Sequence, residues 1–306
     1  MQKRTIGALG ALAAAVMLLP ASVAGQDGPL TTPWGDPDLQ GTWSYASLTP
    51  LQRPTSMSDK EFFTPEEAAQ RNYAVTLDQP DTPGSVGSYN ALWFDRGEVS
   101  SDMRTSLIVD PADGRLPVTA ETQRRQTELR EYARAHPADS WVDRTNWDRC
   151  ITYHGVPPIS TGYNNSVQIL QTPTHVAIRM ENIHDVRIIP LDGRPQLDDK
   201  IRQWNGDSRA HWDGDTLVIE TANYSDQTVH RFPSSRQTKA VERFRRVAED
   251  RIETEFTIED ATVYTAPWTA VRPMPRLDGY IIYEYACHEG NYAMSNILMS
   301  ERSAER

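Results

Sequence analysis

Residues 163–190 read YNNSVQILQTPTHVAIRMENIHDVRIIP, and residues 206–223 read GDSRAHWDGDTLVIETAN. Both stretches alternate apolar and polar side chains, a pattern typical of half-buried β-strands. Residues 166–171 and 175–190 predict an antiparallel hairpin that turns at residues 172–174, and residues 213–215 predict a tight turn. These stretches therefore predict a mainly antiparallel β-sheet.

More strand patterns follow along the chain, joined by short turns, at residues 216–221, 240–247, 251–259 and 280–287. Strands do not alternate with helices, which argues against a doubly wound fold. The pattern predicts an antiparallel up-and-down β-barrel or clam of lipocalin-like type. Gly41 and Trp43 form a Gly-x-Trp pair, which often opens the first strand of such barrels.

The N-terminal half adds a few short helices. Thr64, Pro65 and Glu67 form a capping pattern that predicts a helix within residues 62–75. A second, highly charged helix is predicted over residues 119–135. We expect an irregular portion over residues 25–103 and a β-rich core over residues 104–306, together forming one domain.

The start of the chain indicates export. Lys3 and Arg4 precede an apolar run at residues 6–19, and small residues follow at 22–24, which predicts a signal peptide over residues 1–24. The run is too short for a membrane-spanning helix, and no later stretch of the sequence approaches one, so no stable membrane insertion of the mature chain is expected. We expect a periplasmic or extracellular protein.

The charge balance is acidic, with 31 Lys and Arg against 42 Asp and Glu. An acidic surface argues against nucleic acids and anionic membranes as partners. The expected partner is a small-molecule substrate or ligand, on the basis of the polar clusters described below.

Two cysteines, Cys150 and Cys287, are expected to form one disulfide in an exported protein. The chain-entropy model assigns roughly 4–5 kcal/mol to closing so long a loop. The alternative, a thiol that ligates a metal or acts as a nucleophile, lacks any C-x-x-C spacing.

Histidine and asparagine interrupt the apolar face of the predicted strand 175–190. Alternation places Asn182 and His184 on that face and Asp185 and Arg187 on the opposite, charged face. His184 is therefore a candidate general acid or base, oriented by a partner from a neighbouring strand, and Asn182 a candidate substrate contact. The alternative for His184 is a hydrogen-bonded core histidine.

A second polar cluster occupies residues 206–212. Arg209 is a candidate for stabilising an anion, because a guanidinium binds a carboxylate or an enolate oxygen well. Asp207, His211 and Trp212 are candidate substrate contacts. Asp207 and Arg209 also share one face of the strand, so a structural ion pair is the alternative.

A third cluster follows the second cysteine. The disulfide would hold this stretch rigidly, which makes His288 or Glu289 a candidate for a second proton-transfer group and Tyr285 a candidate substrate contact. A salt-bridged terminal strand is the alternative.

Several chemistries lack their usual motifs. Spacings such as H-x-H and H-E-x-x-H are missing, so no metal site is predicted. A nucleophile elbow, a phosphate loop and a dinucleotide fingerprint are missing too, and no cofactor is expected.

The strings RIIPLDGRP (187–195), GDSRAHWDGDTLVIET (206–221) and YEYACHEGN (283–291) resemble a large family of exported bacterial proteins of unknown function. The resemblance covers about residues 104–298 and implies export without implying a particular activity. His211 stands where the resemblance implies a small residue, which would suit a role in tuning this protein's own substrate.

The clusters favour a secreted enzyme that performs acid–base chemistry, as a lyase, isomerase or hydrolase, on an aromatic, terpenoid or sugar-like molecule. This interpretation requires His184, Arg209 and one of His288 or Glu289 within about 8–10 Å around one pocket. A lipocalin-type ligand-binding or carrier protein is the alternative, and a structural envelope domain is the third.

Overall fold

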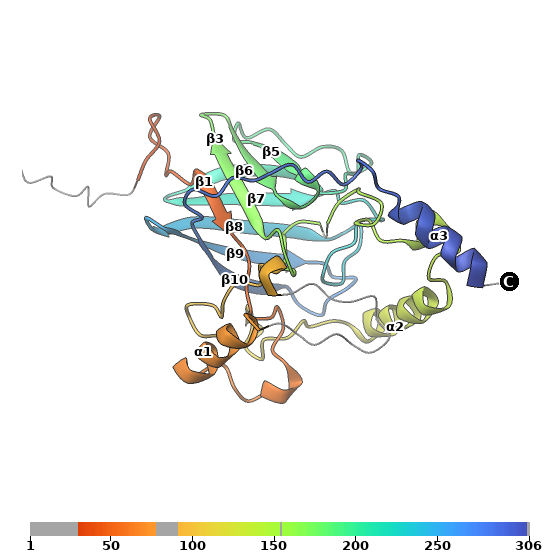
Figure 1. Ribbon diagram of the computed structural model, residues 1–306. Helices are drawn as coiled ribbons and strands as arrows, with labels where there is room; N and C mark the ends of the chain where they lie inside the picture. Colours follow the sequence, from red (N-terminus) through yellow and green to blue (C-terminus); the bar gives the residue numbers. More distant parts are fainter. Residues whose placement is uncertain (1–29, 78–90, 154, 305–306) are drawn as a thin grey trace, which may run out of the picture.

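The computed structural model describes residues 30–77, 91–153 and 155–304, without the side chain of His184. Two antiparallel β-sheets with facing apolar sides form the body of the molecule (Figure 1). The first sheet has the strand order β1-β3-β4-β5. Its strands are β1 (Gly41–Ser44), β3 (Ser166–Gln171), β4 (His175–Met180) and β5 (Val186–Pro190).

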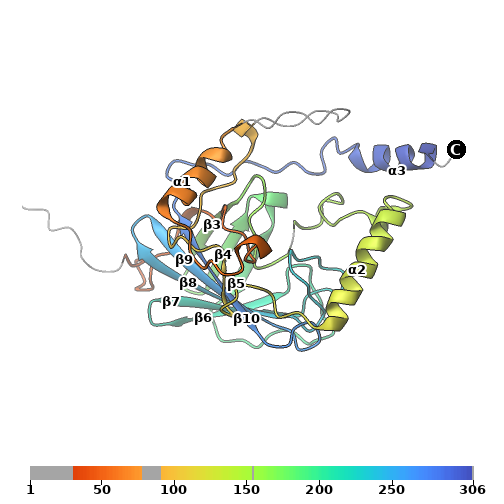
Figure 2. The ribbon, with the colours of Figure 1, turned by 90° about the horizontal axis from the view of Figure 1, so that it is seen from below.

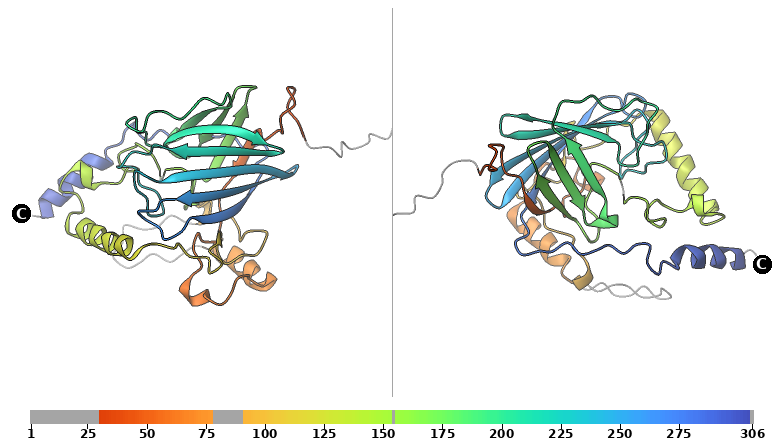
Figure 3. Two further views of the ribbon diagram at one scale, coloured as in Figure 1. Left: turned by 180° about the vertical axis from the view of Figure 1, so that it is seen from behind. Right: turned by 90° about the horizontal axis from the view of Figure 1, so that it is seen from above.

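The second sheet is larger, has the order β2-β10-β9-β8-β7-β6, and is seen broadside in Figure 3. The predicted tight turn at residues 213–215 joins β6 to β7. Its strands are β2 (Ile108–Asp110), β6 (Asp207–Asp213), β7 (Thr216–Ala222), β8 (Lys239–Ala248), β9 (Arg251–Glu259) and β10 (Trp268–Pro275).

Apolar side chains from both sheets share one core. Ile178 of β4 and Ile219 of β7 belong to the same buried cluster, which also includes the fully buried Trp43. The Trp43 indole donates a hydrogen bond to the carbonyl of Leu39 at 2.9 Å, so its polar atom is satisfied inside the core. A second cluster surrounds Trp268.

The two sheets are not joined into a closed barrel. No backbone ladder connects β5 to β6 in the described ranges, whereas an isolated bridge links Trp43 to Arg276 on the opposite side. The prediction of a mainly antiparallel β-protein is confirmed. A closed barrel is not found.

Helices lie outside the sheets, and α2 and α3 occupy one end of the molecule (Figure 2). The side chain of Thr64 caps α1 in the predicted capping box with Glu67, and that of Thr119 caps α2. The helix α3 lies in the C-terminal half, where no helix was predicted. The helices are α1 (Pro65–Ala74), α2 (Ala120–Ala135) and α3 (Ala293–Ala304), and the 3₁₀ turns are η1 (Thr55–Met57), η2 (Ala91–Trp93), η3 (Trp141–Asp143) and η4 (Asn182–His184).

The prediction of one continuous strand over residues 175–190 is wrong. The chain reverses within η4, where Ile183 has a φ of 57°, and β5 returns antiparallel to β4. The reversal changes which residues point inward. Arg187 and Ile189 are buried, whereas Val186 and Ile188 are exposed. Asn182 and His184 consequently belong to a turn, not to the face of a strand.

The predicted strand at residues 280–287 is also wrong, because this stretch has no regular structure. The strand β10 was missed because it contains Pro273 and Pro275, and proline cannot donate a ladder hydrogen bond. In the described ranges, β2 pairs with β10 at Thr269 and Ala270, the Val271 N–H donates to the Leu107 carbonyl at 2.9 Å, and Pro273 lies beyond these contacts.

The N-terminal portion is less irregular than expected, because β1 lies within residues 25–103 and pairs with β3. The predicted signal peptide, residues 1–24, lies outside the described residues.

Candidate functional site

A cavity of about 470 Å³ lies between the start of β5 and the segment 202–208 that leads into β6. It combines exposed apolar side chains with buried polar groups. Its lining residues are Ile151, Asp185, Val186, Arg187, Ile188, Arg202, Gln203, Trp204, Asn205, Gly206, Asp207 and Ser208.

A glycine fixes the course of the segment 202–208. Gly206 has a φ of +71°, and a Cβ there would come within 2.6–2.9 Å of β7 and Tyr224. Gln203 pairs with Tyr224 in an isolated parallel bridge, and its backbone N–H donates to the Asn223 carbonyl at 3.0 Å. The tight turn over β7 thereby brings Trp204 and Asn205 to the cavity wall.

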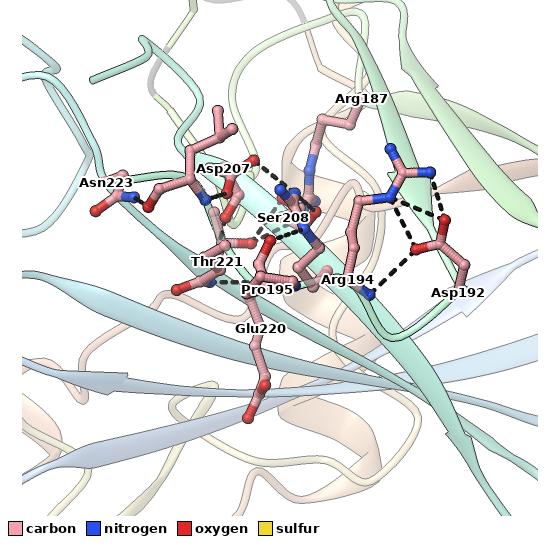
Figure 4. A network of polar contacts seen from close by, with 12 residues as sticks. Arg187, Asp192, Arg194, Pro195, Asp207, Ser208, Glu220, Thr221 and Asn223 are labelled. Carbon is pink, nitrogen blue, oxygen red and sulfur yellow. Dashed lines mark hydrogen bonds and ion pairs between the residues drawn. The ribbon is translucent and has the colours of Figure 1, made fainter. Parts of the chain in front are cut away.

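Arg187 reaches from the cavity into the space between the sheets. Its Nη2 donates to Glu242 Oε2 of β8 at 2.6 Å and lies 3.2 Å from the hydroxyls of Ser208 and Thr221. Arg187 and Glu242 are both almost fully buried, so the pair is shielded from water. Figure 4 shows Arg187 directed toward Ser208 and Thr221.

A second buried guanidinium lies deeper between the sheets. Arg272 of β10 is 1% exposed, donates through Nη1 to the Pro158 carbonyl at 2.5 Å, and lies over the rings of Tyr45 and Phe256. Burial lowers the pKa of Arg272 to about 10, and the side chain therefore remains charged at neutral pH.

Arg209 is engaged in structural contacts. Its Nη1 donates to Asp207 Oδ1 at 2.6 Å and to the Ser208 carbonyl at 2.7 Å, and its Nε donates to the Pro195 carbonyl at 3.0 Å. The other oxygen of Asp207 accepts the backbone N–H of Leu197 at 2.8 Å (Figure 4). Asp207 lines the cavity and Arg209 does not, so these contacts favour the alternative of a structural ion pair.

The reversal between β4 and β5 places Asp185 at the cavity and Glu181 against the C-terminal segment. The Thr152 hydroxyl lies 3.0 Å from Asp185 Oδ2 and 3.1 Å from Asn205 Oδ1, at the wall of the cavity. Asp185 follows the left-handed Ile183, a conformation that costs a β-branched residue about 1–3 kcal/mol. The side chain of His184, between these two residues, lies outside the description.

Glu181 starts the reversal and is buried against the C-terminal segment. Its carboxylate accepts hydrogen bonds from the hydroxyls of Ser166 and Tyr280, the latter at 2.7 Å. Burial, followed by the neighbouring Glu181 carboxylate, raises the pKa of Tyr280 to about 12. Asn182 is fully buried and donates to the Asn164 carbonyl at 2.8 Å, and it does not line the cavity.

The third cluster lies on the C-terminal segment. The expected disulfide between Cys150 and Cys287 is present, with a Cα–Cα distance of 5.7 Å, and the hydroxyl of Tyr285 accepts a hydrogen bond from the Trp147 indole at 3.0 Å. His288 and Glu289 are exposed, and neither lines the cavity.

The remaining predicted contacts lie elsewhere on β6. His211 is exposed, and Trp212 packs against the core shared by the two sheets. Of the nine predicted site residues, only Asp207 has a described side chain that lines the cavity.

Sequence reasoning missed Arg202, Trp204, Asn205 and the inward direction of Arg187. The burial of Glu242 could have been predicted from the sequence, because Glu242 shares a strand face with the apolar Ala240 and Phe244.

Within the described ranges, no group of three His, Cys, Asp or Glu side chains is placed to hold a metal ion. No helix in this part of the chain is long and apolar enough to cross a membrane.

No known family and no curated protein matches the sequence. Two crystal structures of the fluorescent protein UnaG are partly similar. The wild type has 13% identity over 37% of this chain and 72% of that chain, and an asparagine-to-alanine mutant has 12% over 37% and 70%. Both have a TM-score of 0.24, which is too low to support a conclusion about fold or ligand.

Proposed function

We propose that this chain is an exported protein that binds a small organic molecule in the cavity between β5 and the segment 202–208. One observation carries the proposal. A cavity of about 470 Å³ is lined both by exposed apolar side chains, Val186 and Ile188, and by polar side chains such as Asp185 and Asn205. Ligand sites of proteins typically have a volume of about 300–1,000 Å³ and join apolar walls to a few fixed polar groups.

Other features support this function. The disulfide between Cys150 and Cys287 is compatible with an oxidising compartment and so with export. Two facing sheets with an open edge beside β5 suit a lipocalin-type or clam-like binding protein. The proposed relationship to a family of exported bacterial proteins rests on motifs that include residues 187–195 and 206–221, which contribute to the cavity.

Acid–base catalysis in the same cavity is the second candidate. The strained reversal at Ile183 favours it, because such strain often accompanies active sites and Asp185 of this reversal lines the cavity. In this version His184 and Asp185 would transfer protons. The contacts of Arg209 and the exposure of His288 and Glu289 give these three residues no part in it.

The test compares two apolar surface residues. Ile188 lines the cavity and is 70% exposed, and Ile281 lies on the C-terminal segment and is 66% exposed. Purified protein would be screened by native mass spectrometry for copurified molecules and by thermal shift against small acids, alcohols, amines and sugars. We expect binding that Ile188→Ser weakens and Ile281→Ser preserves.

The proposal is wrong if no compound binds or copurifies, or if both substitutions weaken binding equally. Turnover of a bound compound by the wild type would favour the enzyme over the carrier.

A further inference from the structure

Large apolar side chains are exposed at the end of the molecule that carries α2 and α3 (Figure 2). In the described ranges, neither helix packs extensively against another helix or strand, although helices this short take most of their stability from packing. Six apolar side chains of this region are each more than half exposed, and together they are named the end face. They are Leu129, Tyr132, Trp141, Val142, Tyr292 and Met299. None of them lines the cavity beside β5.

A side-chain contact joins the α2 part of the end face to η3. Leu129 and Tyr132 are three residues apart and therefore share one side of α2. The Tyr132 hydroxyl donates to Asp143 Oδ1 at 3.3 Å, in the same 3₁₀ turn that contains Trp141 and Val142. The exposed side of α2 thus lies next to the exposed side chains of η3.

A second contact joins the start of α3 to the segment that follows η3. Asn291 Nδ2 donates to Sγ of Cys150 at 3.2 Å, beside the disulfide. Tyr292 comes next in the chain, and its carbonyl accepts the Asn296 N–H at 3.0 Å where α3 begins. Met299 is two helical turns further along and lies on the same side of the helix as Tyr292. The six side chains therefore belong to one connected region.

The exposed apolar area is large for a protein that works alone. Because an aromatic side chain has about 150–250 Å² of surface, six large side chains exposed by more than half leave on the order of 600 Å² uncovered. The largest apolar patch of a typical monomer covers about 300–600 Å², and each partner in a standard interface buries about 800 Å². Aromatic residues, here half of the six, are also enriched in interfaces. The end face therefore has the size and composition of one side of a protein interface.

Charged groups of both signs border the end face without pairing. Arg125 lies one turn before Leu129 on the same side of α2, and the guanidinium of Arg149 lies 4.7 Å from the ring centre of Trp141. Among the described residues, neither arginine has a carboxylate within ion-pair distance, and the exposed Glu289 has no cation within that distance. The disulfide brings Arg149 and Glu289 into the same region, yet they form no ion pair within one chain.

We propose that the end face is the interface of a two-fold symmetric dimer of this chain. In such a dimer the same surface meets itself, so Arg125 and Arg149 of one copy face Glu289 of the partner subunit. A second copy fits better than a partner of a single charge sign, because a partner with only one sign would leave either the arginines or Glu289 unpaired. The dimer would cover the exposed sides of α2 and α3.

Two leucine variants test the position of the interface. Leu129→Lys places a charge in the end face, and Leu170→Lys places one on β3, where Leu170 is 50% exposed and outside the end face. Sedimentation velocity and native mass spectrometry of the mature chain would measure the Kd of the dimer. We expect Leu129→Lys to raise this Kd at least roughly tenfold and Leu170→Lys to leave it unchanged. Near-ultraviolet circular dichroism would verify that both variants keep the fold.

Two charge reversals test the symmetry. Arg125→Glu and Glu289→Arg each place like charges opposite one another in a homodimer, so each variant alone should dissociate more readily than the wild type. An equimolar mixture of the two variants restores opposite charges at both symmetric contacts. We therefore expect the mixture to contain heterodimers, which native mass spectrometry identifies by their mass.

A wild type that stays monomeric at its highest soluble concentration would overturn the proposal. A dimer whose Kd responds equally to Leu129→Lys and Leu170→Lys would overturn it too, because its interface would lie elsewhere. Binding of a monomeric wild type to phosphatidylcholine vesicles would assign the end face to a membrane instead. Homodimers without heterodimers in the mixture of charge reversals would overturn the two-fold arrangement.

Discussion

Nη2 of Arg187 lies 2.6 Å from Oε2 of Glu242, and this buried pair connects the edge strand β5 of one sheet to the central strand β8 of the other. The Ser208 and Thr221 hydroxyls contact the same nitrogen, so β6 and β7 join the network. Removing one charge would leave the other buried without its partner.

We therefore expect Glu242→Leu and Arg187→Met each to lower the free energy of unfolding by about 3–5 kcal/mol, because each leaves an uncompensated buried charge. The double variant should lose less than either single variant. Urea unfolding of the four proteins measures these changes. Additive losses in the double variant would show that the pair is not coupled.

His230 should make stability depend on pH. Its ring lies between Tyr224 and Phe232, and burial lowers its pKa to about 4 from an ordinary value of 6.5. The unfolded chain binds this proton at a higher pH than the folded chain does. The contribution of neutral His230 to the free energy of unfolding is therefore fully present above pH 6.5. This contribution decreases by up to about 3 kcal/mol as the pH falls toward 4.

The check is urea unfolding of the wild type and of His230→Gln between pH 7.5 and pH 4.5. The variant should lose less stability than the wild type over this range, because other acidic groups titrate alike in both. Parallel losses would contradict the assignment to His230.

Tyr280 should stabilise the C-terminal segment through Glu181. Tyr280→Phe removes a 2.7 Å hydrogen bond to a buried carboxylate, and we expect a loss of about 1–3 kcal/mol in the free energy of unfolding. Tyr283→Phe is the matched control, since Tyr283 is 74% exposed on the same segment, and it should change stability by less than about 0.5 kcal/mol. Similar losses in both variants would argue against the role of Glu181.

The disulfide should hold the segment before α3 against the body. Replacing Cys150 and Cys287 with serine removes a link across 137 residues, which the chain-entropy model values at roughly 4–5 kcal/mol. We expect a lower midpoint of thermal unfolding and faster proteolysis within residues 276–304. Limited proteolysis followed by mass spectrometry would locate the cuts. Cuts at unchanged rates in this segment would show that other contacts hold it.

Local signals predicted the parts of the fold that depend on local sequence. Caps at Thr64 and Thr119 located two helices, and turns between regular strand patterns located β7 to β9. The reversal at Ile183 escaped prediction because it contains no glycine or proline and because the apolar alternation continues in phase through it. Because nothing in the sequence marked this turn, the alternation pattern placed Arg187 on the exposed face, whereas its side chain is buried.

The cavity was harder to predict than the strands. Its walls come from segments that meet only in the folded chain, such as Ile151, the start of β5 and Trp204. The density of His, Asp and Arg predicted a site at residues 207–212. In the structure, hydrogen bonds within this segment occupy Arg209. A charged residue on the apolar face of a predicted strand, Glu242 within residues 240–247, was the more informative signal for a buried polar group.

The two edges of the four-stranded sheet differ in how they are fastened. Beside β1, the Trp43–Arg276 bridge and a 2.8 Å hydrogen bond from the Leu277 N–H to the Thr42 carbonyl act as a hinge. Beside β5, side chains such as Arg187 and Ser208 act as a latch without described backbone pairing to β6. Rotation about β1 would therefore separate β5 from β6 without breaking a strand ladder, but it would have to break the buried Arg187–Glu242 pair, which makes this pair the contact that keeps the edge closed.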